Sequence, residues 1–356
     1  MRARGGEDGI IDVSGNEIVQ FIYDRIYSFY KGLAKVEMGG RFGFIDRAGN
    51  LVITCKYDHA EEFSEGLARV VIENKKYFID TSGKIVISVD YEYAGGFNDG
   101  LACVCGNRKY GFINKKGEEV IQLKYEYAGS FHDGRAVIIK NNKYGFLDKK
   151  GNEVVPAIYD SLGFIDNEFH DGLICVVKRE EQGGKSEKLV SYPEDYNSDI
   201  HEIEKGPRVT VMQEGLHGFV DKNGNEVIPL QYDHASFFHE GLADVEKDGK
   251  VGFIDKTGKT IIPFIYEYAH LFIEGLCSVK KDGKYGCINK KGETVIPFLY
   301  DNIDLLHNGL AVFTKEEKKG VVDNSGKIII EPQYDELFEH EGCFVAANWI
   351  LKNSFE

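Results

Sequence analysis

Residues 252–285 read G-F-I-D-K-T-G-K-T-I-I-P-F-I-Y-E-Y-A-H-L-F-I-E-G-L-C-S-V-K-K-D-G-K-Y, and the chain consists of nine edited copies of this stretch. A tyrosine followed by an acidic residue marks each copy. The step from one tyrosine to the next is constant, except for one longer step between the fifth and the sixth. The nine are Tyr23, Tyr57, Tyr91, Tyr125, Tyr159, Tyr232, Tyr266, Tyr300 and Tyr334. A fixed period of roughly 34 residues predicts one repeat array rather than two ordinary domains.

A second position of the repeat, which we call the slot, recurs with the same period. It holds glycine in every copy but one, where Tyr77 replaces it. Its members are Gly9, Gly43, Gly111, Gly145, Gly218, Gly252, Gly286 and Gly320. Between these positions the sequence predicts three short strands in each copy, and the remaining segment, from the tyrosine–acid pair onward, is either a packed loop or a short fourth strand. The first is the Gly-Leu-Ala-x-Val type segment at 66–70, the second resembles 285–288, and the third is the Val-Ile-Pro type run. The turn from Asp148 to Gly151, closed by a left-handed glycine, predicts a tight hairpin.

Both faces of the predicted strands are apolar, since neighbours such as Phe112 and Ile113 must point in opposite directions. Sheets that are buried on both faces have to stack on one another. We therefore expect an all-β fold of nine ~34-residue, three-stranded antiparallel repeats stacked in an open superhelix or solenoid. A closed propeller-like ring is the alternative.

The break in the period sets the expected boundaries. They are an N-terminal tail at 1–8, repeats one to five at 9–178, a polar insertion in repeat five at 179–209, the end of repeat five and repeats six to nine at 210–352, and a C-terminal tail at 353–356. Insertions in repeat proteins map to loops on one face, often the binding face. The candidate binding residues of the insertion are Glu180, Lys185, Tyr192, Tyr196 and Arg208. A tolerated surface loop is the alternative, because long loops cost little stability.

The unit G-L-A-x-V-x-x-x-x-K-x-G-F-I-D-x-x-G-x-x-V-I-P-x-x-Y-D-x-x-x-x-F-x-x-G resembles the WG repeat, also called the KWG repeat, of bacterial proteins. The resemblance covers residues 9 to about 350 apart from the insertion. The tryptophan that gives the family its name is absent from every unit, and Phe42, Tyr110, Tyr144 and Tyr285 stand before the slot glycine in four of them. The resemblance implies a binding or scaffolding module rather than an enzyme.

Histidines recur two residues before a glycine, at His132, His170, His239, His307 and His340. Each of these five copies supplies one, without a second histidine or a cysteine at ligand spacing, so we expect no metal and no cofactor. The chain has no nucleophile elbow, Walker loop or paired-carboxylate motif, and we expect no catalytic residue. The nine repeat tyrosines are interpreted as structural, with each ring packed between units.

Acidic residues outnumber basic ones by 58 to 43, which argues against nucleic acid as the main ligand. No apolar run is long enough to span a bilayer, the N-terminus lacks a secretion signal, and the seven cysteines are scattered; we expect a cytoplasmic protein. The sequence thus favours a non-enzymatic repeat scaffold for protein–protein interaction, such as a sensor or recognition module. A glycan or cell-envelope binding module that uses exposed aromatic residues is the alternative.

Overall fold

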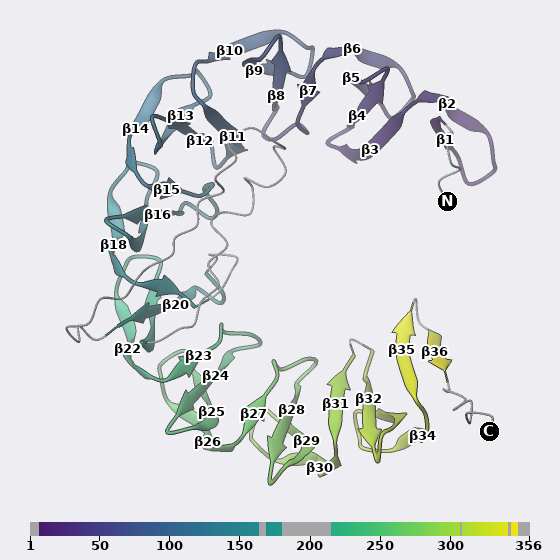
Figure 1. Ribbon diagram of the computed structural model, residues 1–356, viewed down its shortest axis with the longest axis vertical. Coiled ribbons are helices and arrows are strands. Elements are labelled where there is room, and N and C mark those ends of the chain that lie inside the picture. Colours follow the sequence, from purple (N-terminus) through teal and green to yellow (C-terminus); the bar gives the residue numbers. More distant parts are fainter. Residues whose placement is uncertain (1–6, 164–168, 180–214, 307, 341–342, 348–356) are drawn as a thin grey trace, which may run out of the picture. The chain divides into compact units, whose positions relative to one another are not determined.

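The computed structural model describes residues 7–163, 169–179, 215–306, 308–340 and 343–347, which form an all-β protein of repeated antiparallel sheets (Figure 1). The chain divides into two compact units, Met1–Ala157 and Ile158–Glu356. Among the residues described, no helix is long and apolar enough to cross a membrane.

The first unit opens with a two-stranded sheet and continues with four-stranded sheets, in each of which the strands follow one another in chain order. The two-stranded sheet contains β1 (Asp8–Ile11) and β2 (Glu17–Tyr23). The four-stranded sheets contain β3 (Arg25–Tyr30), β4 (Leu33–Met38), β5 (Arg41–Asp46) and β6 (Leu51–Tyr57); β7 (His59–Ala60), β8 (Leu67–Ile72), β9 (Lys75–Asp80) and β10 (Ile85–Val89); β11 (Tyr93–Asn98), β12 (Leu101–Gly106), β13 (Lys109–Asn114) and β14 (Glu119–Tyr125); and β15 (Tyr127–Ala128), β16 (Ala136–Lys140), β17 (Lys143–Leu147) and β18 (Glu153–Tyr159).

The second unit repeats the same sheet and closes with a two-stranded one. Its four-stranded sheets contain β19 (Ser161–Leu162), β20 (Leu173–Lys178), β21 (Leu216–Asp221) and β22 (Glu226–Tyr232); β23 (His234–Ala235), β24 (Leu242–Lys247), β25 (Lys250–Asp255) and β26 (Thr260–Tyr266); β27 (Tyr268–Ala269), β28 (Leu276–Lys281), β29 (Lys284–Asn289) and β30 (Thr294–Tyr300); and β31 (Asn302–Leu305), β32 (Leu310–Lys315), β33 (Lys318–Asp323) and β34 (Ile328–Tyr334). The two-stranded sheet contains β35 (Glu336–His340) and β36 (Cys343–Ala347).

Each complete sheet has four strands instead of the expected three, because the segment after the tyrosine–acid pair, for which a packed loop and a short fourth strand were the two alternatives, forms a strand at the start of the sheet. This strand lies directly after the tyrosine–acid pair and is often very short. In β15, Tyr127 pairs with Ile139 and Ala128 pairs with Ile138 on the neighbouring strand β16, and the strand ends there. So short a strand cannot show the alternation of apolar and polar side chains from which a strand is recognised.

The slot glycine is required because two backbones approach each other closely at its position. A Cβ atom at Gly43 would lie 2.5 Å from the carbonyl oxygen of Ile53 on β6. The register shifts there, since Phe42 pairs with Tyr57 while Phe44 pairs with Ile53, which leaves extra residues of β6 opposite one glycine. This is a β-bulge, and it bends the last strand of the sheet.

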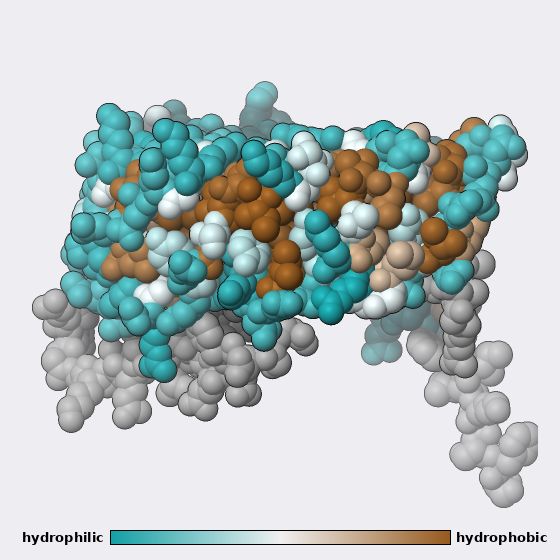
Figure 2. Space-filling model, turned by 90° about the horizontal axis from the view of Figure 1, so that it is seen from above, coloured by the Kyte–Doolittle hydropathy of each residue, from teal (hydrophilic) through white to brown (hydrophobic). Residues whose placement is uncertain are grey.

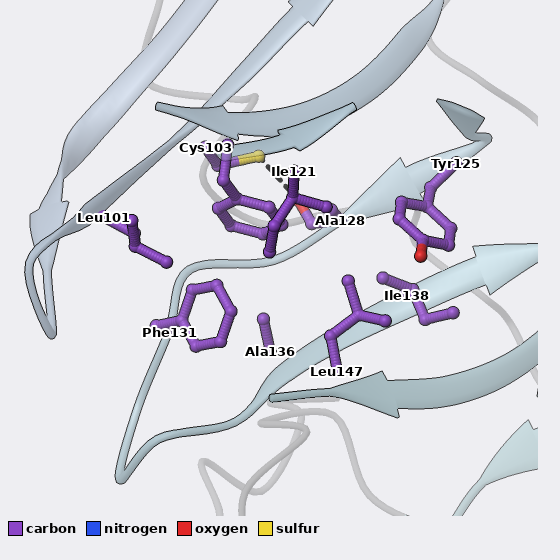
Figure 3. Close-up of a cluster of buried hydrophobic side chains, with 10 residues drawn as sticks. Leu101, Cys103, Ile121, Tyr125, Ala128, Phe131, Ala136, Ile138 and Leu147 are labelled. Atoms are coloured by element: carbon purple, nitrogen blue, oxygen red, sulfur yellow. Dashed lines mark hydrogen bonds between the residues drawn. The ribbon is translucent and has the colours of Figure 1, made fainter. Parts of the chain in front are cut away.

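The core of the protein lies between successive sheets. Figure 3 shows one such cluster, in which Leu101, Ile121 and Tyr125 of one sheet meet Phe131 and Ile138 of the next. In five of these contacts a phenylalanine on the third strand of one sheet meets a phenylalanine that precedes the second strand of the next sheet. The ring centroids are 4.7 Å apart for Phe44 and Phe63, 4.8 Å for Phe78 and Phe97, 4.7 Å for Phe112 and Phe131, 4.8 Å for Phe219 and Phe238, and 5.1 Å for Phe253 and Phe272. Each repeat therefore buries its apolar surface only by stacking on its neighbour.

Acidic side chains at the turn before the second strand also connect one sheet to the next. The Oε2 atom of Glu65 accepts a hydrogen bond of 2.9 Å from the backbone N–H of Gly100 and lies 3.1 Å from the Nζ atom of Lys115. Equivalent contacts join Asp99 to Gly134 and Lys149, and Glu240 to Gly275 and Lys290. These hairpin-tip lysines thus pair within the chain.

Candidate functional site

The nine repeat tyrosines lie in the framework of the fold. Seven have buried side chains, and Tyr57, Tyr125 and Tyr266 belong to clusters between two sheets. Tyr91 and Tyr334 are half-buried. The hydroxyl groups of Tyr57 and Tyr125 are buried without a hydrogen-bond partner among the residues described. These side chains are therefore poorly placed to meet a ligand.

The acidic residues that follow the tyrosines hold turns in place. The Oδ2 atom of Asp58 accepts from the backbone N–H of Glu73 at 2.6 Å, and that of Asp301 accepts from Glu316 at 2.8 Å. Both donors lie in the turn between the second and third strands, where Glu73 and Glu316 have left-handed backbone angles. The carboxylates satisfy N–H groups that the turn leaves without a strand partner.

The five candidate residues of the insertion, Glu180, Lys185, Tyr192, Tyr196 and Arg208, lie outside the described residues. Of the recurring histidines, His132, His170 and His239 are placed, and the Nδ1 atom of His239 lies 2.8 Å from the carbonyl oxygen of Phe272 in the next sheet. In the part of the chain that the structure describes, no three His, Cys, Asp or Glu side chains are grouped to hold a metal ion.

The structure brings together two positions that the sequence reading missed. One is the fourth residue after the repeat tyrosine, and the other is the third residue after the glycine that precedes the second strand. In several sheets the backbone N–H of the former donates to the carbonyl oxygen of the latter, for example Glu61 to Arg69 at 2.9 Å and Ser236 to Asp244 at 3.0 Å. We call these two positions the variable pair. The pairs are Tyr27/Lys35, Glu61/Arg69, Gly95/Cys103, Gly129/Val137, Gly163/Cys175, Ser236/Asp244, His270/Ser278 and Asp304/Val312.

In three of the eight variable pairs the two side chains complement each other chemically. The Nζ atom of Lys35 lies 4.1 Å from the ring centroid of Tyr27, a cation–π contact. Arg69 forms an ion pair with Glu61, although the Arg69 side chain is only 2% exposed. The Oγ atom of Ser236 donates a hydrogen bond of 2.7 Å to the Oδ2 atom of Asp244. The same backbone position thus carries a cation, a thiol, an apolar group or a carboxylate in different sheets.

The Ser236/Asp244 pair borders a cavity of about 180 Å³ between the sheet β23–β26 and the start of the sheet β27–β30. Its lining residues are Ser236, Phe237, Asp244, Tyr268, Ala269, His270 and Leu271. The Asp244 side chain is half-buried, and its removal from water raises the pKa of the carboxyl group, while the Ser236 hydroxyl and the nearby His234 and His270 lower it. The cavity therefore presents one carboxylate, one hydroxyl and aromatic rings.

His217 lies in the sheet that precedes this site and occupies the position that holds Tyr110 or Tyr144 elsewhere. Its ring centroid is 5.3 Å from that of His234. Burial and the neighbouring His234 lower the pKa of His217 from 6.5 to about 4, so the imidazole is neutral at pH 7.

An alignment of the nine copies could have revealed the variable pair. The two positions keep the same separation in every sheet except the one that holds Gly163 and Cys175. Both change in charge and size, while the residues that flank the second position stay apolar. The cavity itself has no signal in the sequence, because it depends on where the Tyr268–Leu271 segment of the next sheet lies.

The sequence profile described as WG containing repeat matches nine segments of the chain, at residues 9–42, 42–77, 78–110, 110–144, 144–180, 218–250, 252–285, 285–318 and 320–346. No curated protein sequence matches the chain. The predicted resemblance over nine repeats is confirmed by this match.

Several solved structures are similar to the chain at low sequence identity. A eukaryotic initiation factor is 8% identical, with 97% of each chain covered and a TM-score of 0.41. Hsv2 of Kluyveromyces lactis is 8% identical over 63% of this chain and 70% of that one, with a TM-score of 0.31. PorZ of Porphyromonas gingivalis, a surface component of the type-IX secretion system, is 9% identical over 88% of this chain and 45% of that one, with a TM-score of 0.29. At scores below 0.5, these likenesses carry no argument about this chain.

Proposed function

The chain belongs to the WG containing repeat family, and we propose that it is a non-enzymatic scaffold that binds a partner protein in the cytoplasm. The observation that carries the proposal is the variable pair. Its first position changes chemically on the same backbone and is partly or fully exposed in several sheets, as Tyr27, Glu61, His270 and Asp304 show. Its second position is buried in every one of these pairs except Ser236/Asp244. A repeat protein can recognise a specific partner when a backbone position is the same in every repeat and its side chain differs from one repeat to the next.

The absence of an enzymatic role is supported by the state of the nucleophilic side chains. Burial raises the pKa of the thiols of Cys103, Cys175 and Cys277, which keeps them protonated at pH 7 and poorly reactive. All seven cysteines are free, which fits a reducing compartment.

Site-specific photo-crosslinking in lysate of the source cell tests the scaffold proposal. A photoreactive amino acid is placed at His270, an exposed member of a variable pair, or at Glu62, which is exposed and follows the member Glu61. The control positions are Val120 and Val227, which are exposed on the last strand of their sheets. We expect positions 270 and 62 to capture the same protein, and positions 120 and 227 to capture none. Capture only from positions 120 and 227 would overturn the role of the variable pairs, and capture of carbohydrate instead of protein would favour a glycan-binding module.

The exposed apolar residues differ from the variable pairs in that they are similar from one sheet to the next. Figure 2 shows that apolar side chains gather in patches on one face of the molecule. The second residue of the last strand is repeatedly an exposed β-branched residue, as at Val52, Val86, Val120 and Val227. Since these side chains are alike in each sheet, they offer little basis for selecting a partner, and they serve as the control positions above.

We further propose that the sheets continue as an open superhelix rather than a closed propeller-like ring. Two features support this arrangement. A repeat of about 34 residues is short compared with the roughly 40 or more of a typical four-stranded propeller blade, and nine copies would make an unusually large ring. The clusters between sheets involve only sequential neighbours within each unit, as a stack requires.

A further inference from the structure

Asp244 differs from Lys35 and Arg69, the buried ionised members of other variable pairs, because no ion pair or aromatic ring of its own pair compensates its charge. Lys35 lies over the Tyr27 ring, and Arg69 is paired with Glu61. Within the described residues, no Lys or Arg side chain forms an ion pair with Asp244, whose carboxylate accepts a hydrogen bond from the Ser236 hydroxyl. A half-buried carboxylate without a counter-charge is costly unless something else satisfies it.

The cavity beside Asp244 has the composition of a site for an organic cation. Ser236 uses one carboxylate oxygen of Asp244, and the other lining groups include the rings of Phe237, Tyr268 and His270. Aromatic faces and a carboxylate together stabilise a desolvated ammonium group. A metal ion is a poorer fit, because no three ligand side chains are grouped among the residues described.

The geometry also favours an ammonium over a guanidinium group. An arginine side chain binds a carboxylate best through two parallel hydrogen bonds, one to each oxygen. Ser236 already donates to Oδ2 of Asp244 at 2.7 Å, so only one oxygen is fully available. An ammonium group is a compact charge that needs a single acceptor and can donate its other protons to neighbouring oxygens.

We propose that the cavity lined by Ser236, Asp244, Tyr268 and His270 binds an alkylammonium group, with the carboxylate of Asp244 as its counter-charge and the aromatic rings around its methylene groups. The proposal rests on the scaffold function, and it names the chemistry that the partner brings to this sheet. The source of the group is either a lysine side chain of the partner or a free alkylamine, since both present the same atoms to Asp244.

Binding is tested on the full chain by NMR titration of backbone amide signals. The probes are Nα-acetyl-lysine methylamide, its Nε-acetylated form, and n-butylammonium. We expect saturable shifts of the Asp244 and Tyr268 amide signals with the lysine probe and with n-butylammonium, and none with the Nε-acetylated probe. Tighter binding of the lysine probe assigns the site to a polypeptide, and tighter binding of n-butylammonium assigns it to a free amine. Equal shifts with the acetylated probe, or no saturable shift, would overturn the proposal.

Three variants make the test specific. D244N should weaken binding by about tenfold or more, because it removes a charge-assisted contact. H270K places an ammonium group of the chain at the cavity and should abolish probe binding while Asp244 is retained, which keeps the test valid if D244N folds poorly. D304N makes the same change at an exposed member of another variable pair and should bind like the parent. Unchanged binding by both D244N and H270K would sink the assignment.

The photo-crosslinking experiment separates this inference from the scaffold proposal. If D244N is cross-linked to the partner as efficiently as the parent, the ammonium site is not used by the partner while the scaffold role stands. If the parent itself captures no protein from positions 270 and 62, the scaffold role fails, whatever the small probes do.

Discussion

Phe112 and Phe131 belong to neighbouring sheets, their ring centroids lie 4.7 Å apart, and both are members of the buried cluster that also contains Tyr125. Edge-to-face contact between such rings is favourable beyond the burial of their area. Because an equivalent contact recurs in sheet after sheet, the stability of each sheet depends on the next. The energetic consequences can be tested at a single repeat.

Tyr125 is fully buried in this cluster. We expect Tyr125→Ala to lower the free energy of unfolding by about 3–5 kcal/mol, as aromatic-to-alanine changes in a core do. Tyr125→Phe should be near neutral, since the hydroxyl has no hydrogen-bond partner among the residues described and its removal breaks no such bond. Urea unfolding followed by circular dichroism measures both. A parent-like midpoint for the alanine variant would show that the ring does not support the contact between sheets.

A double-mutant cycle tests whether the variable pair Glu61/Arg69 can be replaced by the equivalent pair of another sheet. Glu61→Gly alone should destabilise the chain by about 3–5 kcal/mol, because it leaves the charge of Arg69 buried and unpaired. Glu61→Gly with Arg69→Val copies the pair Gly129/Val137 and should recover most of the loss. Arg69→Val alone serves as the fourth corner of the thermodynamic cycle. If the double variant were no more stable than Glu61→Gly, the residues of a variable pair could not be replaced by those of the equivalent pair in another sheet.

His217 makes the stability of the second unit depend on pH. Its folded-state pKa is about 4 and its ordinary value is 6.5, so the unfolded chain binds the proton more tightly. The contribution of His217 to the free energy of unfolding is therefore fully present above pH 6.5. It falls by about 3 kcal/mol as the pH decreases from 6.5 towards 4. His217→Tyr, which restores the residue found at Tyr110 and Tyr144, should flatten this part of the profile. The free energy of unfolding is measured by urea titration at several pH values from 7 to 4. The same pH dependence in the parent and in His217→Tyr would contradict the role given to His217.

The sequence predicted the all-β repeat and its family because both depend on residues that keep one period. It left the first strand of each sheet undecided between a packed loop and a short strand, since a strand as short as β7 or β15 resembles a loop in sequence. The variable pair was missed because the repeat was recognised by residues that are the same in every copy. Asp244 and Arg69 occupy a position whose residue type differs between copies. The candidate residues of the insertion, such as Tyr192, lie outside the described part and stay a prediction.

Tyr77 shows how one substitution changes a repeat without removing it. In place of the slot glycine it takes up a regular register, with Lys76 paired to Val89 and Phe78 to Ile87, so the bulge found beside Gly43 is absent. The strand β10 then ends at Val89, before it reaches Tyr91, and Tyr91 is half-buried where Tyr57 is fully buried. The exception was visible in the sequence, but its effect on the next tyrosine follows from the geometry of the bulge.

The open superhelix is the proposal that solution scattering tests most directly. A compact chain of this length has a radius of gyration of about 20 Å, and an open stack of sheets that contact only their neighbours should exceed it clearly. Small-angle X-ray scattering of the full chain measures this value, and spin labels at Ser14 and Ser325, both in exposed turns, measure the distance between the two ends. We expect a large radius and a long, broad distance distribution. A radius near the compact value with a short, narrow distance would mean that the ends meet, and the closed ring would replace the superhelix.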